Sequence, residues 1–131
     1  LWPSGQVLAD LIAAGGLDLP AATADSVCCE LGCGAAALPS LAFAGTRPGR
    51  VIATDTEEVL SITSSNVARA VAGARLKGEL SLLPCDWSDR SAGRPKADVL
   101  LMADLLYAGR HYDDLIHTID LMLNPDGGLL L

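Results

Sequence analysis

The chain alternates between two spacings of apolar residues, and this alternation predicts its secondary structure. Short continuous apolar runs are typical of buried strands, whereas apolar residues that recur every three or four positions mark one face of a helix. Strands are predicted at 27–31, 51–54, 80–83 and 98–103, with a fifth beginning at 128. Helices are predicted at 4–14 after a Ser4 cap, at 39–44, from an Asp55 or Thr56 cap to 71, and at 112–123.

Strands that alternate regularly with helices predict an α/β fold. We expect a doubly wound, mainly parallel sheet with right-handed crossovers and helices on both faces, because the strands are apolar along nearly their whole length. The 131 residues suffice for one domain with one core, so we assign residues 1–131 to it. The last residues read as an apolar strand with an open edge, which favours a domain truncated after its fifth strand, within a longer chain.

Composition and charge narrow the classes of partner. The formal net charge is −7, and the few Lys and Arg residues are scattered, which argues against nucleic acid as a partner. The apolar stretches are short and interrupted, so no membrane span is expected. Cys28, Cys29 and Cys33 do not match metal-ligand spacings. We expect reduced, packed thiols, no metal, and a cytoplasmic or nuclear location.

The carboxyl ends of the first four predicted strands carry residues suited to ligand binding. In an open doubly wound sheet, ligands bind beyond these ends, where the strand order reverses. The residues that follow the four strands are Gly32, Cys33 and Gly34, then Asp55, then Asp86 and Trp87, then Ala103, Asp104 and Tyr107. Because parallel strands end at one edge of the sheet, we expect these residues to line one crevice.

Each candidate also has a purely structural interpretation. Gly32-x-Gly34 lets the backbone approach a ligand closely, but ordinary strand-to-helix turns also use glycine. Asp55 lies 21 residues after Gly34, close to the spacing at which an acid holds a ribose diol, yet it could cap the next helix instead. Asp86 and Trp87 suit an adenine amine and ring, or a surface acid beside a core indole. His111 and His117 are interpreted as surface or loop residues.

Taken together, these motifs resemble a known family. Glu30-Leu31-Gly32-Cys33-Gly34 resembles motif I of class I S-adenosylmethionine-dependent methyltransferases, and Val51 to Asp55 resembles the second, acidic motif. Leu1-Trp2-Pro3-Ser4-Gly5, Asn66, Asp86-Trp87 and Ala103 to Tyr107 are together similar to lysine methyltransferase family 16. This resemblance implies a Rossmann-like methyltransferase fold, S-adenosylmethionine as cofactor and a protein lysine as methyl acceptor.

The resemblance also implies a role for each matching residue. Trp2 would close over the cofactor, and Glu30, Gly32, Cys33 and Gly34 would border its methionine end. Asp55 would hold the ribose hydroxyls, Asp86 and Trp87 would bound the adenine, and the Ala103 backbone would line the pocket. Asp104-x-x-Tyr107 matches the acid-x-x-aromatic motif beside the incoming lysine, where we expect Asp104 to orient the amine and Tyr107 to form a channel wall. The alternative for this pair is a loop cap and core packing.

Two departures from the family pattern keep other functions open. Ala36 stands where the family usually has a third glycine, and two further strands of the family domain are absent. A catalytically inactive methyltransferase fold that serves as an interaction module is therefore one alternative. The other is an NAD-dependent oxidoreductase, because Gly32-x-Gly34-x-x-Ala37 fits the dinucleotide fingerprint.

Overall fold

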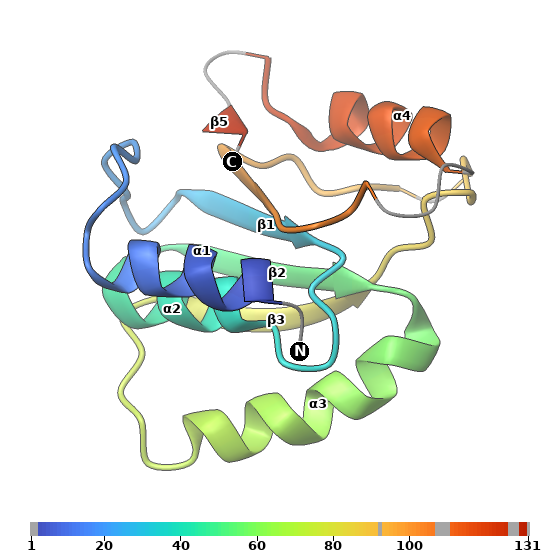
Figure 1. Ribbon diagram of the computed structural model, residues 1–131. Coiled ribbons are helices and arrows are strands. Elements are labelled where there is room, and N and C mark those ends of the chain that lie inside the picture. Colours follow the sequence, from blue (N-terminus) through green and yellow to red (C-terminus); the bar gives the residue numbers. More distant parts are fainter. Residues whose placement is uncertain (1–2, 92, 107–110, 126–128, 131) are drawn as a thin grey trace.

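The computed structural model describes residues 3–91, 93–106, 111–125 and 129–130 (Figure 1). The helices are α1 (Pro3–Ala13), α2 (Leu38–Thr46), α3 (Glu57–Val71) and α4 (Tyr112–Met122). The strands are β1 (Val27–Leu31), β2 (Arg50–Asp55), β3 (Glu79–Pro84), β4 (Val99–Met102) and β5 (Leu129–Leu130). None of the helices in these ranges has the length and apolar character needed to cross a bilayer.

The strands form one sheet in the order β3-β2-β1-β4-β5, and every neighbouring pair is parallel. The chain moves outward from β1 to β3 and then returns past β1 to β4, so the strand order reverses between β1 and β4. The register pairs Leu31 with Thr54 on one side and with Met102 on the other. The carboxyl ends of β1, β2 and β4 therefore lie side by side. The predicted doubly wound parallel sheet is confirmed.

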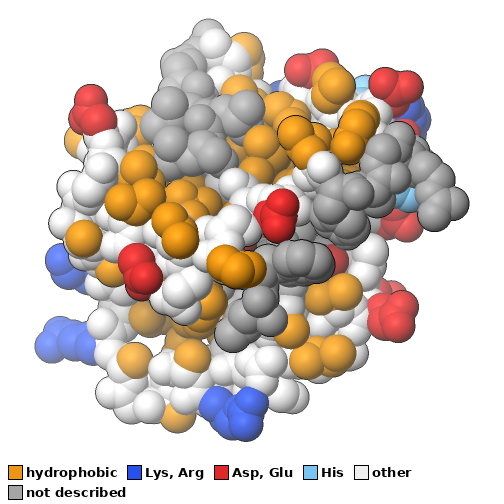
Figure 2. All heavy atoms as spheres, in the orientation of Figure 1, with side chains coloured by type: hydrophobic (Ala, Val, Ile, Leu, Met, Phe, Trp, Pro, Cys, Tyr) orange, Lys and Arg blue, Asp and Glu red, His pale blue; other side chains and the backbone are white. Residues whose placement is uncertain are grey.

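Helices cover both faces of the sheet, because successive strand residues point to opposite sides. Cys28 and Val51 pack with Phe43 of α2 and Ile12 of α1, and α3 extends this layer over β2 and β3. Cys29 packs on the other face in a cluster that includes Leu115 and Met122 of α4. Figure 1 shows the same arrangement, with α1, α2 and α3 on one side of the sheet and α4 on the other. Figure 2 shows exposed apolar side chains over α1, where Val7 and Leu11 are exposed.

The predicted cap of the first helix is wrong. Ser4 lies inside α1, and its buried Oγ has no hydrogen-bond partner among the described residues. The helix begins one residue earlier than predicted, because the fixed φ angle of Pro3 already suits the first position of a helix. Asp98, predicted as the first residue of the fourth strand, lies just before β4. Its carboxylate accepts a 2.9 Å hydrogen bond from the Val27 N–H and thereby ties the start of β4 to the start of β1.

The connection from β3 to β4 forms no helix in its described residues, and Arg94 holds it in place. The guanidinium donates to Cys85 Sγ at 2.7 Å and to the carbonyl oxygens of Asp86 and Asp89 at 2.8 Å each. One side chain thus joins both parts of this loop. The loop carries Asp86 and Trp87 at the carboxyl edge of the sheet.

Candidate active site

A cavity of about 720 Å³ opens at the carboxyl edge of the sheet, a size typical of small-molecule sites. Segments that follow β1, β2, β3 and β4 all contribute to its wall. The predicted site residues that line it are Glu30, Gly32, Cys33, Gly34, Asp55, Asp86, Trp87, Ala103 and Asp104. Trp2 and Tyr107 lie outside the described residues. The sheet therefore brings the described candidates to one cavity, and their individual roles stay predictions.

The turn after β1 requires glycine at its first position. Gly32 has a φ of 63°, and a Cβ added there would come within 2.5 Å of Leu105 Cδ2. Gly34 has a φ of 60°, but a Cβ there would meet no atom within 4 Å. Both residues occupy the left-handed region that L side chains rarely adopt. At Gly32 the glycine is needed for space as well as for backbone angle.

Helix α3 holds the carbonyl groups of this turn. Thr63 Oγ1 lies 2.9 Å from both the Gly34 carbonyl and the Val59 carbonyl of its own helix, so its one hydrogen is shared between these acceptors. Asn66 Nδ2 donates to the Ala35 carbonyl at 2.7 Å. Thr63 is fully buried. Asn66 was predicted only through the family resemblance, and Thr63 was not predicted from the sequence. The spacing of three residues on a helix, which places both side chains on one face, was the available signal.

Asp55 lies at the end of β2, directly before Thr56, which is the N-cap residue of α3. Its Oδ2 accepts a 2.8 Å hydrogen bond from the Gly34 N–H, and its Oδ1 accepts one from the Thr56 N–H, also at 2.8 Å. The carboxylate therefore fixes the turn after β1 and the start of α3 at once. Each carboxylate oxygen has a second lone pair, so the half-buried side chain can still accept hydroxyl hydrogens from a ligand.

Glu30 is a buried acid at the wall of the cavity. It is 3% exposed, and Ser40 donates to its Oε2 from both the backbone N–H at 2.9 Å and Oγ at 2.5 Å. Burial raises the pKa of Glu30 to about 7, and the Asp55 charge adds to this, while the two Ser40 hydrogen bonds act in the opposite direction. An acid of this kind is poised to change charge near neutral pH.

The segment after β3 presents an acid and an indole. Ser88 donates to Asp86 Oδ1 from its N–H at 2.9 Å and from its Oγ at 2.7 Å, and these bonds lower the pKa of Asp86. Trp87 is half-buried, packs against the core cluster on the α4 face and lies next to Gly32. The indole thus has one side fixed in the core and another at the cavity.

The segment after β4 contains a residue in an unusual conformation. Asp104 has a φ of 61° and lies exposed at the cavity wall. Asp tolerates the left-handed region better than most residues, yet such angles persist mainly at functional sites and tight turns. Leu105, the next residue, packs over Gly32.

His111 is the exposed loop residue that the sequence predicted, and it also lies at the cavity, which the sequence analysis did not predict. His111 lines the cavity, and its Nδ1 lies 3.9 Å from Asp114 Oδ2. It precedes α4, so it follows β4 at the same edge of the sheet as the other candidates. Its position after the fourth predicted strand was the available signal in the sequence. The described residues contain no group of His, Cys, Asp and Glu arranged to hold a metal ion.

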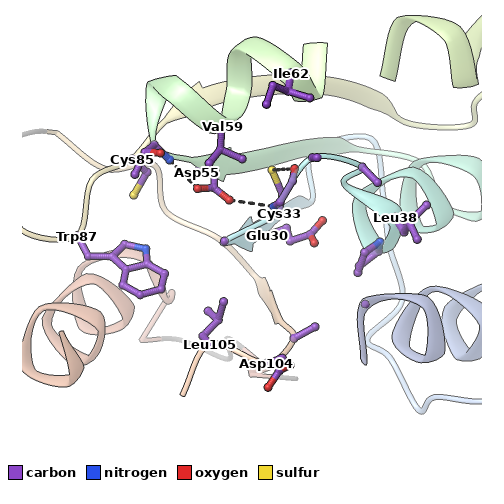
Figure 3. A pocket seen from close by; sticks show the side chains of 18 of the residues that line it. Glu30, Cys33, Leu38, Asp55, Val59, Ile62, Cys85, Trp87, Asp104 and Leu105 are labelled. Atoms are coloured by element: carbon purple, nitrogen blue, oxygen red, sulfur yellow. Dashed lines mark hydrogen bonds between the residues drawn. The ribbon is translucent and has the colours of Figure 1, made fainter. Parts of the chain in front are cut away.

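Figure 3 shows how the labelled side chains divide the cavity. Trp87 and Cys85 lie at one end, and Glu30 and Leu38 lie at the other, with Asp55 between them. Asp104 and Leu105 form the opposite side. The arrangement suits an elongated ligand with a flat aromatic end, a hydroxyl-bearing middle and a cationic end.

A glycine turn after β1 and an acid at the end of β2 line the same cavity, an arrangement typical of α/β domains that bind nucleosides. The chain belongs to the lysine methyltransferase family, whose sequence model matches residues 1–131. No curated protein matches the sequence.

Solved structures share the fold at low sequence identity. A proposed S-adenosyl-L-methionine-dependent methyltransferase from Methanococcus maripaludis aligns with a TM-score of 0.65 and 16% identity, over 95% of this chain and 52% of that one. Magnesium protoporphyrin IX methyltransferase (ChlM) from Synechocystis PCC 6803 with bound SAM aligns with a TM-score of 0.62 and 19% identity, over 92% and 55%. PKMT2 from Rickettsia typhi in complex with AdoHcy aligns with a TM-score of 0.59 and 18% identity, over 92% and 23%. The chain thus spans about half the length of the first two.

Proposed function

We propose that this protein is an S-adenosylmethionine-dependent methyltransferase that transfers a methyl group to a lysine side chain of another protein. The family membership supports methyl transfer, and the family's description supports a lysine acceptor. The observation that carries the proposal is the convergence of four strand ends on one cavity, with Trp87, Asp55 and Glu30 in that order along it (Figure 3).

The residues present fit this cofactor. An indole and an acid at one end suit the adenine ring and its amine, and a carboxylate with spare lone pairs at Asp55 suits the ribose hydroxyls. The turn at Gly32 lets backbone approach the ligand without a side chain between them. Glu30 at the other end suits the positively charged amino group of the methionine part. The backbone of Ala103 lines the space between the ends.

The chemistry is an in-line displacement. Bound S-adenosylmethionine would supply a methyl group on a positively charged sulfur; the lysine nitrogen would take this methyl group, and the electron pair of the broken bond would stay on the sulfur of a neutral thioether. The amine must lose a proton to solvent before or during transfer. In this proposal Asp104 orients the amine, Leu105 excludes water, and the remaining lining holds the reactants in line. Tyr107, outside the described residues, is proposed as a wall of the acceptor channel.

The alternatives predict different ligands. An oxidoreductase would bind NAD, and an interaction module would bind neither nucleotide. Calorimetry of the purified protein with S-adenosylhomocysteine and with NAD separates the three cases. Binding of the first ligand alone is expected. Binding of NAD alone, or of neither ligand, would overturn the proposal.

The role of Asp104 can be tested without disturbing its backbone. Because φ is 61°, Asp104→Gly removes the carboxylate and relaxes the backbone, whereas Asp104→Ala would add strain. We expect Asp104→Gly to lower the methyl-transfer rate roughly a hundredfold with unchanged affinity for S-adenosylhomocysteine. Asp120→Gly, on the exposed side of α4, is a control for charge. Full activity of Asp104→Gly would refute the role assigned to Asp104. A separate experiment, mass spectrometry of the methylated product, tests whether lysine is the acceptor.

A further inference from the structure

Ser40 is a buried residue that does not line the cavity but is hydrogen-bonded to Glu30, which does. It lies in the first turn of α2 and is 0% exposed. Both of its donors are directed to one carboxylate oxygen, Oε2 of Glu30. Within the described residues, Oε1 accepts no hydrogen bond. The carboxylate is therefore fixed through one oxygen and available through the other.

No positive charge offsets the charge of Glu30 within the described chain. The acid forms no ion pair there, and α2 contains no charged residue. The charged residue of α1, Asp10, is exposed. Asp55 faces Glu30 from the end of β2 and disfavours its ionisation. The neighbouring thiols of Cys28 and Cys33 have pKa values raised by burial, so they stay neutral near pH 7.

A buried carboxylate without a cation is unstable unless hydrogen bonds compensate. Ser40 supplies two such hydrogen bonds, and a cation in the cavity would supply the remaining stabilisation of the Glu30 carboxylate. We propose that Ser40 is a positioning residue that keeps the Glu30 carboxylate charged and aims its free oxygen at the α-ammonium group of the bound cofactor. This inference rests on the proposed function, since it takes S-adenosylmethionine as the ligand.

The inference predicts a pH dependence with a definite sign. Only the ionised acid attracts the ammonium group, so affinity should fall as the pH drops below the pKa of Glu30, which is about 7. Removing the Ser40 hydroxyl removes a bond that lowers this pKa. The midpoint of the binding profile should therefore move to higher pH in Ser40→Ala.

The experiment is calorimetry between about pH 6 and about pH 8 with two ligands, S-adenosylhomocysteine and 5′-methylthioadenosine. Only the first carries the ammonium group. For it, Ser40→Ala should raise the midpoint by about one pH unit and weaken binding at low pH roughly tenfold. The ligand's own titration is common to both proteins and cancels in the comparison. For 5′-methylthioadenosine, both proteins should bind equally at every pH, which also shows that the variant is folded.

Glu30→Gln provides a second, independent arm. Gln can still accept from Ser40 but carries no charge, so its profile should be flat, and adding Ser40→Ala to it should cause no further shift. A profile of Ser40→Ala that superimposes on the wild type would overturn the inference while leaving the proposed function intact. A pH-dependent profile that persists in Glu30→Gln would overturn it as well. If the unsubstituted protein binds neither ligand, the proposed function fails first.

Discussion

Gly32 and Gly34 form a matched pair that separates backbone strain from steric overlap. Both have φ values near 60°, so alanine at either position is forced into the left-handed region. That conformation destabilises an L residue by about 1–2 kcal/mol. Alanine has less backbone freedom than glycine in the unfolded chain, and this offsets the destabilisation by about 0.4–1 kcal/mol. We therefore expect Gly34→Ala, whose Cβ meets no atom, to lower the free energy of unfolding by roughly 1 kcal/mol.

Gly32→Ala should lower the free energy of unfolding by more than Gly34→Ala does, because the new methyl group overlaps Leu105. The Cβ would lie 2.5 Å from Cδ2 of that residue, so the leucine must move. Overpacking of this kind costs about 1–3 kcal/mol, and the lower end applies because only the tip of a half-buried side chain is displaced. The expected total for Gly32→Ala is roughly 2–3 kcal/mol.

Urea denaturation of the ligand-free protein, followed by circular dichroism, measures both losses. A double-mutant cycle with Leu105→Ala isolates the overlap, since the penalty of Gly32→Ala should then approach that of Gly34→Ala. Equal losses for Gly32→Ala and Gly34→Ala in the unaltered background would refute the steric argument. So would a Gly32→Ala penalty that persists in full when Leu105 is Ala.

Three further substitutions test the supports of the site. Glu30→Gln should stabilise the ligand-free protein by up to about 3 kcal/mol above pH 7 and by little near pH 4. The pKa of Glu30 is about 7 in the folded protein and 4.5 in the unfolded chain, so between these values the folded protein binds more protons. The unsubstituted protein therefore loses stability as the pH rises from 4.5 to 7, and urea titrations at both pH values measure the difference. Arg94→Met removes the hydrogen bonds that hold the loop after β3, so it should weaken binding of S-adenosylhomocysteine about tenfold in calorimetry and speed amide exchange in residues 85–89. The control Arg90→Met, at an exposed position, should change neither the affinity nor the exchange rate. Thr63→Val, nearly equal in volume, should lower the free energy of unfolding by about 1–2 kcal/mol in urea, and an unchanged value would contradict its support of the glycine turn.

The order of elements and the position of the site could be predicted because both depend on local patterns. Continuous apolar runs separated by helical periodicity predicted β1 with the bounds that the structure has, 27–31. The parallel topology then places every strand's carboxyl end at one edge. The candidates Gly32, Asp55 and Trp87 follow from this rule alone, and the structure places them around one cavity.

The residues that sequence reasoning missed act across elements. Ser40 and Thr63 are small polar residues inside helices, and such residues are common without any special role. Their importance depends on which carboxylate or carbonyl group the fold places opposite them, namely Glu30 and Gly34. Spacing along one element contains no information about that placement. His111 was missed for a related reason, because its position follows from the path of the chain after β4.

The glycine turn after β1 is held in one conformation by hydrogen bonds from the rest of the protein. The Cys33 N–H donates to the Thr54 carbonyl, and the Gly34 N–H donates to Asp55, while the carbonyl groups of Gly34 and Ala35 accept from α3. A turn fixed in this way loses little conformational freedom when a ligand binds, so more of the contact energy contributes to affinity. The same logic applies to the loop after β3, where Arg94 joins segments that no helix supports. We therefore expect substitution of the supporting side chains Thr63, Asn66 and Arg94 to weaken ligand binding although their hydrogen bonds are made to other parts of the protein.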